Sequence, residues 1–216
     1  MRIIFLLASQ TGTGVNTIAV NLASGLARSS YRVLLSGACV DPGLIAWLEG
    51  PGNDQAELLK KFSGLEWRRK FELADLETTF DHLYDYLIYI PGKDKEHLGS
   101  MIKHQALTIC VIDAGKDDAD SIISMDEKFR RLCGGTKGFD LLVSNKVRPG
   151  EWDKSSTLIF DLAGQLGWDK LADPIPYCEA IHDLAMENKS VWDLPSQYSN
   201  RQEAFQRLVQ RVVELS

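Results

Sequence analysis

The sequence lacks a long apolar run and an excess of positive charge. No apolar stretch reaches the roughly 18 residues that a membrane-spanning helix needs, so we expect no transmembrane segment. The short apolar run at residues 3–8 leads into glycine-rich sequence, which is typical of a buried first strand and not of a signal peptide. The formal net charge of −6 argues against broad, non-specific nucleic-acid binding, because such binding depends on Lys and Arg.

The sequence also has few cysteines, and none of them are paired at short spacing. They are Cys39, Cys110, Cys133 and Cys178, and no two form a Cys-x-x-Cys motif. This spacing suggests neither a zinc site nor a disulfide framework. Scattered, reduced thiols are typical of a cytosolic protein, so we expect a cytoplasmic location and no metal site.

Strand-like and helix-like segments alternate along the chain. Continuous apolar runs predict strands buried on both faces at 3–8, 32–35, 86–90, 107–112 and 139–143. Apolar residues at helical spacing predict helices at 17–28, 117–132, 155–166, 179–187 and 201–215. The fold class is therefore α/β, with a mostly parallel central sheet flanked by helices, in a single domain spanning residues 1–216.

Two segments need a separate interpretation. Residues 48–75 are the least regular part, with turn signals at 50–54, and Trp67-Arg68-Arg69-Lys70 within them is a tight basic cluster. We interpret this cluster as solvated surface, with a contact to a partner or a phosphate left open. The segment 201–215 is amphipathic, and we expect it to pack on the sheet. Its polar face mixes both charge signs, unlike a lipid-binding helix, so a peripheral membrane contact remains only the alternative.

A glycine-rich turn separates the first predicted strand from the first predicted helix. It reads Ser9-Gln10-Thr11-Gly12-Thr13-Gly14-Val15-Asn16-Thr17. Strand, glycine-rich turn and helix form the context of a P-loop, in which backbone N–H groups and a helix N-terminus bind phosphate. A dinucleotide site is disfavoured, because Thr17 stands where the third glycine of Gly-x-Gly-x-x-Gly belongs.

The charged side chains of a P-loop are missing from this turn. Val15 stands in place of the lysine that neutralises phosphate, and Asn16 in place of the Ser or Thr hydroxyl that binds magnesium. The side-chain carbonyl of Asn16 is a weaker substitute, while Thr17 is intact. Taken alone, the turn is equally compatible with a tight strand-to-helix connection that binds nothing.

Segments along the whole chain resemble the ParA/MinD family of deviant-Walker P-loop ATPases. The family's Lys-Gly-Gly-x-Gly-Lys-Thr-Thr loop, Asn-Leu-Ala helix motif and Val-Leu-Leu strand are similar to residues 10–17, 21–23 and 32–35. Its Tyr-Asp-Tyr strand, its Asn-bearing strand end and its late Ile-Pro-Tyr and Lys-Pro-Val elements resemble residues 84–91, 142–147, 175–177 and 190–192. The resemblance implies a P-loop NTPase topology of the SIMIBI type.

The departures from the family pattern fall on the residues that carry its chemistry. Gln10 aligns with the family's dimer-crossing lysine, Val15 with its P-loop lysine and Asn16 with its magnesium-binding hydroxyl. Gly37 and Cys39 align with its Asp-x-Asp pair, and Ile90 aligns with its Walker B aspartate. Each such electrostatic contact is worth roughly 2.7–4 kcal/mol in a transition state, so hydrolysis at useful rates is not expected. Asp41 and Asp113 are carboxylates that could compensate, although we interpret both as ordinary loop residues. Asp113 is the more interesting, because it ends a strand.

The side of the site that would hold the base retains more of the pattern. The resemblance implies that Asn145 and the backbone near Pro176 contact adenine, although Asn145 is equally compatible with a turn after a strand. The expected nucleotide-binding residues are Gly12, Thr13, Gly14, Val15, Asn16, Thr17, Asn145 and Pro176. We expect weak binding of ATP or ADP without magnesium, and no catalytic residue.

The resemblance leads to one function and leaves two alternatives open. The chain is predicted to be a non-hydrolysing localisation or partner-binding module, close to the TadZ/CpaE type, that forms a homodimer without depending on ATP. The first alternative is a functional ATPase of the same family in partitioning or positioning, which would use Asn16 and rerouted carboxylates. The second is a nucleic-acid-binding partition protein, which the acidic net charge disfavours.

Overall fold

The computed structural model contains one sheet of six parallel strands. It describes residues 1–37, 42–49, 59, 61–69, 82–91, 105–135 and 137–216. The strands are β1 (Arg2–Ala8), β2 (Val33–Gly37), β3 (Leu65–Arg68), β4 (Tyr86–Ile90), β5 (Leu107–Asp113) and β6 (Leu141–Asn145). Their order in the sheet is β3-β2-β4-β1-β5-β6, and every neighbouring pair is parallel. β1 is therefore a central strand.

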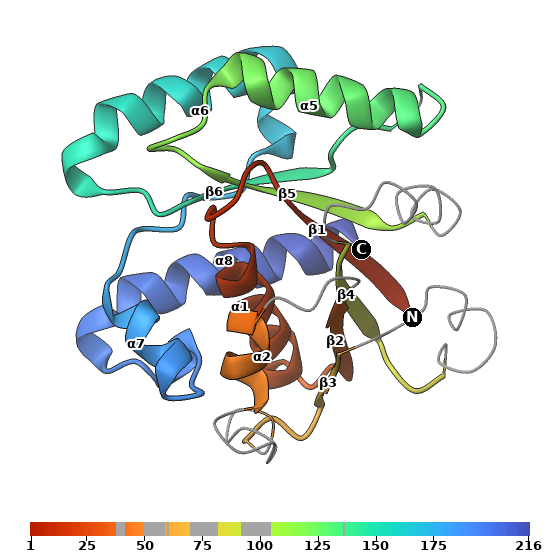
Figure 1. Cartoon of the computed structure of the whole chain (residues 1–216), viewed down its shortest axis with the longest axis vertical. Helices are drawn as coiled ribbons and strands as arrows, with labels where there is room; N and C mark the ends of the chain where they lie inside the picture. The colour runs from red at the N-terminus through yellow and green to blue at the C-terminus, as the bar shows by residue number, and fades with distance from the viewer. Residues whose placement is uncertain (38–41, 50–58, 60, 70–81, 92–104, 136) are drawn as a thin grey trace.

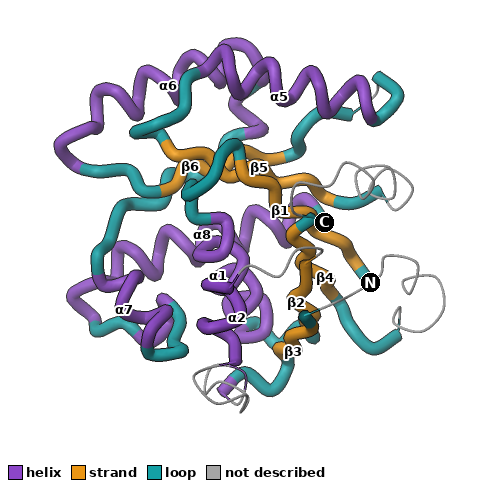
Figure 2. Tube along the Cα trace, viewed as in Figure 1, coloured by secondary structure: helices purple, strands orange, loops and turns teal. Residues whose placement is uncertain are grey.

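Helices cover both faces of this sheet (Figures 1 and 2). They are α1 (Val15–Arg28), α2 (Pro42–Glu49), α5 (Ala119–Leu132), α6 (Trp152–Leu166), α7 (Ala180–Met186) and α8 (Ser199–Leu215). α5 and α6 lie together on one face, whereas α1, α2, α7 and α8 lie on the other. No helix of the described ranges is both long and apolar enough to cross a bilayer.

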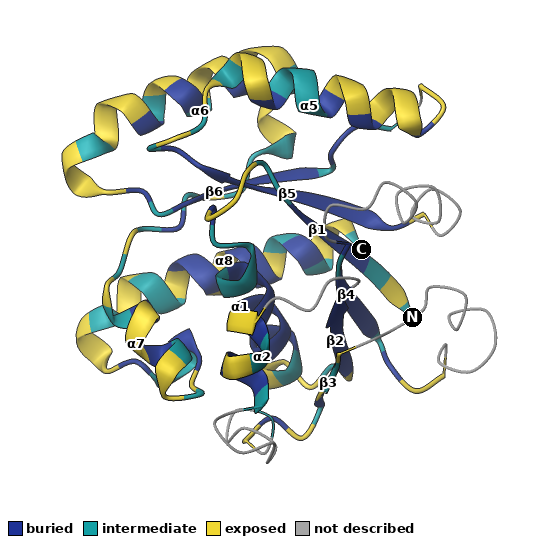
Figure 3. Cartoon of the chain, in the orientation of Figure 1, coloured by how far each residue is buried: buried dark blue, intermediate teal, exposed yellow. Residues whose placement is uncertain are grey.

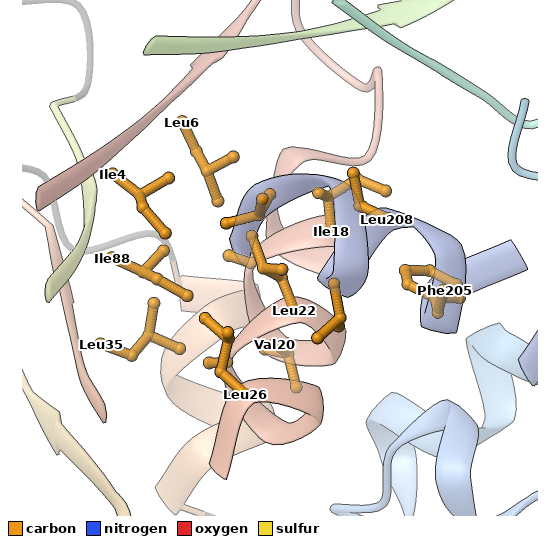
Figure 4. Packing of buried hydrophobic residues seen from close by; sticks show 14 of the residues in the cluster. Ile4, Leu6, Ile18, Val20, Leu22, Leu26, Leu35, Ile88, Phe205 and Leu208 are labelled. Atoms are coloured by element: carbon orange, nitrogen blue, oxygen red, sulfur yellow. The ribbon is translucent and has the colours of Figure 1, made fainter. Parts of the chain in front are cut away.

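The alternation of side chains along the strands produces two cores. Ile4 and Leu6 of β1 face α1 and α8, where they pack with Ile18, Leu22 and Phe205 (Figure 4). The intervening residues of β1 belong to the other core, under α5 and α6. Because successive side chains point to opposite faces, a strand that is apolar throughout is buried on both sides. This is why continuous apolar runs predicted the strands.

The predicted α/β fold is confirmed, with element ends displaced by a few residues. Residues 48–75, the least regular part of the sequence, include the strand β3, which no apolar run predicted. This short edge strand alternates buried Leu65, exposed Glu66 and half-buried Trp67, so it carries no continuous apolar run. The short helix α2 was also missed. The turn signals at 50–54 lie outside the described residues.

The basic cluster at 67–69 is bound to the chain itself. Trp67 Nε1 donates to Glu49 Oε1 at 2.9 Å, and Arg69 forms an ion pair with the same carboxylate. Although burial alone would raise the pKa of Glu49, the hydrogen bond from Arg69 is the largest influence and holds it below its usual value. Lys70 lies outside the described residues. The cluster therefore joins β3 to the end of α2.

Two of the described cysteines are buried thiols of low reactivity. Cys110 and Cys133 are buried, Cys178 is half-buried, and all three are free thiols. Burial raises the pKa of the Cys110 and Cys133 thiols, so little reactive thiolate is present. Cys39 lies outside the described residues.

The amphipathic segment at the C-terminus packs inside the protein, as predicted. Phe205 and Leu208 of α8 are buried in the core that α8 forms with α1 and the sheet (Figure 4). Val209 and Val212 belong to the same buried cluster. α1 gives room for this contact at Gly25, where a Cβ atom would lie 2.6 Å from Val209 Cγ2 and 2.8 Å from Trp192 Cζ2. The apolar face of α8 is therefore used for folding.

Candidate functional site

The candidate site lies where the carboxyl ends of the central strands meet the loop between β1 and α1. β1 pairs with β5 up to Ala8 and Val111, and β5 pairs with β6 up to Asp113 and Asn145. In Figure 1 the loop leaving β1 passes beside the ends of β5 and β6 before it enters α1. This is the edge at which open parallel α/β sheets bind ligands.

Two glycines give the loop its shape. Gly12 and Gly14 have φ angles of 86° and 91°, in the left-handed region that favours glycine. Gly14 is the N-cap of α1, and its carbonyl accepts from Ile18 N at 3.0 Å. A Cβ atom on Gly14 would lie only 2.3 Å from Asn145 Nδ2. The conformation of the loop therefore favours glycine at both positions, and at Gly14 it leaves no room for a side chain.

The residue at the P-loop lysine position packs against the protein core. Val15 opens α1 and packs, half-buried, against the apolar cluster beneath that helix. Asn16 and Thr17 follow in the first turn of α1 and are also half-buried. The start of the helix still offers backbone N–H groups, but the side chain at position 15 provides packing where a P-loop provides charge.

Asn145 contacts the loop. Its Nδ2 donates to the carbonyl oxygen of Thr13 at 2.8 Å, and both residues are buried. Thr13 Oγ1 is buried and has no hydrogen-bond partner among the described residues. Pro176 lies at the same strand end, because the backbone of 175–177 pairs with Val147. The structure thus brings Asn145 and Pro176 together and directs Asn145 to the loop.

Two lysines flank the loop although none lies within it. Lys146, directly after β6, donates from Nζ to the carbonyl of Gly12 and lies 4.0 Å from Asp113 Oδ2. Lys116 Nζ lies 3.9 Å from the same carboxylate oxygen and 3.8 Å from the place of a Cβ on Gly12. Asp113 is 5% exposed, so its carboxylate is largely withdrawn from water and is balanced by these amines.

Asp117 binds the first part of the loop. Its carboxylate accepts from Ser9 Oγ, Gln10 Nε2 and the backbone N–H of Asp113, each at 2.7 Å. Gln10, at the position of the family's dimer-crossing lysine, is therefore bound within its own chain. Sequence reasoning missed Asp117, Lys116 and Lys146. Their common signal is a position within a few residues of a predicted strand end.

The acidic positions of the family are not replaced by another carboxylate cluster in the described structure. Ile90 ends β4 and packs half-buried against the core, and Gly37 is buried at the end of β2. Cys39 and Asp41 lie outside the described residues. Within those ranges, no group of three or more His, Cys, Asp or Glu side chains is arranged to hold a metal ion.

Removing the side chains that grip the loop should make it more mobile. We expect Asn145→Ala together with Lys146→Ala to speed amide hydrogen exchange of residues 11–16 by about tenfold or more, because each lost hydrogen bond is worth about 1 kcal/mol. The matched control is Lys154→Ala, since Lys154 Nζ donates to the carbonyl of Gly115, outside the loop. Equal exchange in the double variant and the control would show that these contacts do not hold the loop.

Comparison with known proteins supports the fold. No family model matches the sequence, and no curated protein matches it. MinD in a MinC:MinD cell division protein complex from Aquifex aeolicus is similar at 15% identity and a TM-score of 0.72, covering 100% of this chain and 97% of that one. Apo McdA from Cyanothece is similar at 15% identity and a TM-score of 0.75, covering 98% and 99%.

A third solved structure is similar over the same extent. It is a putative plasmid partition protein from Borrelia burgdorferi bound to AMPPNP, at 18% identity and a TM-score of 0.71, covering 100% of this chain and 99% of that one. The resemblance to ParA/MinD proteins is thus confirmed at the level of fold. The chain has the ParA/MinD fold, and its P-loop NTPase topology follows from the sheet described above.

Proposed function

We propose that this chain is a ParA/MinD-like protein with a degenerate nucleotide site, acting as a non-hydrolysing localisation or partner-binding module. The observation that carries the proposal is Val15, which packs against the core where catalysis needs a lysine. The nearby amines of Lys116 and Lys146 are already engaged with Asp113. A triphosphate would therefore meet little uncompensated positive charge at the loop.

A nucleotide remains a weak ligand in this proposal. The backbone of Gly12, Thr13 and Gly14 and the start of α1 at 15–17 would hold the phosphates, while Asn145 and Pro176 would contact the base. Asn145 must first give up its bond to Thr13, which lowers the affinity. ATP or ADP would bind without magnesium.

The proposed assembly is a cytoplasmic homodimer that does not require ATP. Gln10 donates a hydrogen bond to Asp117 of its own chain, and it stands where a lysine would have to reach a partner copy. The structurally similar MinD from Aquifex aeolicus is found in a complex with MinC. By analogy, we infer that this chain acts by binding another protein.

Calorimetry and a turnover assay test the proposal together. We expect ATP and ADP to bind weakly, with no gain in affinity from magnesium, and no phosphate release above background. The control is the chain without nucleotide in the same buffer. Magnesium-dependent turnover that disappears in Asp113→Ala would overturn the proposal.

One observation favours the alternative of a working ATPase. Lys116 and Lys146 bring two amines to Gly12 from the ends of β5 and β6, where they could replace the missing P-loop lysine. In that case Lys116→Ala and Lys146→Ala would each abolish turnover. The same assay therefore decides between the two functions.

A further inference from the structure

A repeated aromatic–aspartate pair marks the outer side of α6. Trp152-Asp153, Phe160-Asp161 and Trp168-Asp169 follow one another at intervals of eight residues. The first two pairs lie in α6, and the third lies in the short 3-10 helix Trp168–Lys170 that follows it. All six residues are exposed. We call these six residues the α6 aromatic surface.

The aromatic side chains of this surface are unusually exposed. Trp152, Phe160 and Trp168 are 57%, 63% and 60% exposed, although large aromatic residues are usually mostly buried. The core contact of α6 is made by other residues, namely Leu158, Leu162 and Ala163. Figure 3 shows exposed positions along the outer side of this helix. Packing against the core therefore does not account for the three aromatic rings.

Two of the three rings are in contact, and Trp152 lies further toward the start of α6. Eight residues of α-helix advance about 12 Å and turn the side chain by about 80°, so Trp152 and Phe160 lie along an oblique line on the helix. The ring of Trp168 meets the ring of Phe160 edge-on, with centroids 5.4 Å apart. The Phe160–Trp168 contact orders the side chains before any partner binds, which lowers the entropy cost of binding.

The three aspartates place negative charge on the α6 aromatic surface. Asp153, Asp161 and Asp169 form no ion pair with any residue in the described ranges. Lys170 follows Asp169 directly in the chain and forms no ion pair within the described ranges, so it offsets part of this charge. Two other nearby bases are engaged elsewhere. Lys154 donates to the carbonyl of Gly115, and Arg211 donates to the backbone carbonyl of Asp169 and pairs with Glu214.

The combination of apolar rings and unpaired carboxylates indicates which class of partner could bind this surface. Phosphate-bearing surfaces, whether nucleic acid or anionic lipid, are repelled by this charge. An amphipathic helix with an apolar face bordered by Lys or Arg matches both the rings and the carboxylates. Trp and other aromatic residues also supply much of the binding energy in protein interfaces.

We propose that the α6 aromatic surface docks a basic amphipathic helix of another protein. This inference rests on the proposed partner-binding function and names its surface and the chemistry of the partner. The rings bury the apolar face of the incoming helix. The aspartates pair with its Lys or Arg side chains and set its orientation.

A designed pair of peptides tests the proposal on the full chain. One 18-residue helical peptide carries leucines on one face and lysines along its borders, and its control carries glutamates in place of the lysines. Fluorescence anisotropy measures the binding of each labelled peptide. We expect the lysine peptide to bind at least about tenfold more tightly than the glutamate peptide, a difference of about 1.4 kcal/mol, and to weaken as salt is added.

Two sets of substitutions locate the binding. The aromatic variant carries Trp152→Ala, Phe160→Ala and Trp168→Ala, and the charge variant carries Asp153→Asn, Asp161→Asn and Asp169→Asn. We expect each to weaken binding of the lysine peptide by about tenfold or more, and the charge variant to lose the salt dependence. The matched control changes the exposed α7 residues, Met186→Ala with Asp183→Asn, and should bind as the unaltered chain does. Because the charge variant leaves all packing intact, it remains informative if the aromatic variant fails to fold.

Several results would overturn this proposal. Equal affinity for the two peptides, or unchanged binding in either variant, would remove it. Self-association seen by light scattering and lost in the aromatic variant would identify a second copy as the occupant instead. Co-sedimentation with phosphatidylcholine vesicles, lost in the same variant, would identify a lipid surface. ATP turnover with intact peptide binding would refute the proposed function and leave the docking surface in place. Loss of peptide binding without any ATP turnover would refute the docking surface and leave the proposed function in place.

Discussion

Gly25→Ala is expected to lower the free energy of unfolding by about 1–3 kcal/mol, the usual effect of forcing extra volume into a packed core. The added methyl group would lie 2.6 Å from Val209 Cγ2 and 2.8 Å from the ring of Trp192. Neither neighbour has free space, because Val209 is buried in α8 and Trp192 is packed against the same core. Urea denaturation followed by circular dichroism measures the change.

The matched control is the same substitution in another helix. Gly164 lies in α6, and a Cβ atom there would meet nothing within 4 Å. Gly164→Ala should therefore stabilise the chain by about 0.5–1 kcal/mol, the intrinsic advantage of alanine over glycine in a helix. If both substitutions changed stability in the same direction, α1 and α8 would not be in close contact at Gly25.

The fold was predictable because its signals are local. β1, β4 and β5 are buried on both faces, so their apolar runs are continuous in the sequence. β3 and α2 gave no such signal, for different reasons. β3 has four residues at the edge of the sheet, and α2 has eight, too few for a clear helical period.

The site was predictable only in part, because half of it is assembled by the fold. The glycines of the loop and the loss of its lysine are visible in residues 9–17. The contacts of Asp117, Lys116 and Lys146 depend on how the ends of β5 and β6 meet the loop, which no local pattern records. Asn145 was selected for a contact with a base, and its described contact is with Thr13.

Two of the segments that resemble ParA/MinD motifs, 21–23 and 190–192, contact each other in the structure. Asn21, from the Asn-Leu-Ala segment, accepts a hydrogen bond from Val191 N at 2.6 Å through Oδ1. Its Nδ2 donates to the carbonyl of Thr17, and Trp192 Nε1 donates to its backbone carbonyl. The two similar segments at 21–23 and 190–192 are therefore in contact. Their shared role is to attach the chain before α8 to α1.

Asn21→Leu is accordingly expected to be among the most damaging substitutions in α1. Asn21 is fully buried, and its loss leaves the Val191 N–H without its acceptor, which costs about 1–3 kcal/mol for a buried donor. Ser24→Ala is the matched control, because Ser24 is equally buried in α1 but donates only to carbonyls of its own helix. Denaturation of both variants measures the difference, which we expect to exceed about 1 kcal/mol. Faster amide exchange at 190–194 in Asn21→Leu alone would assign the loss to this link, and equal destabilisation by both substitutions would deny it.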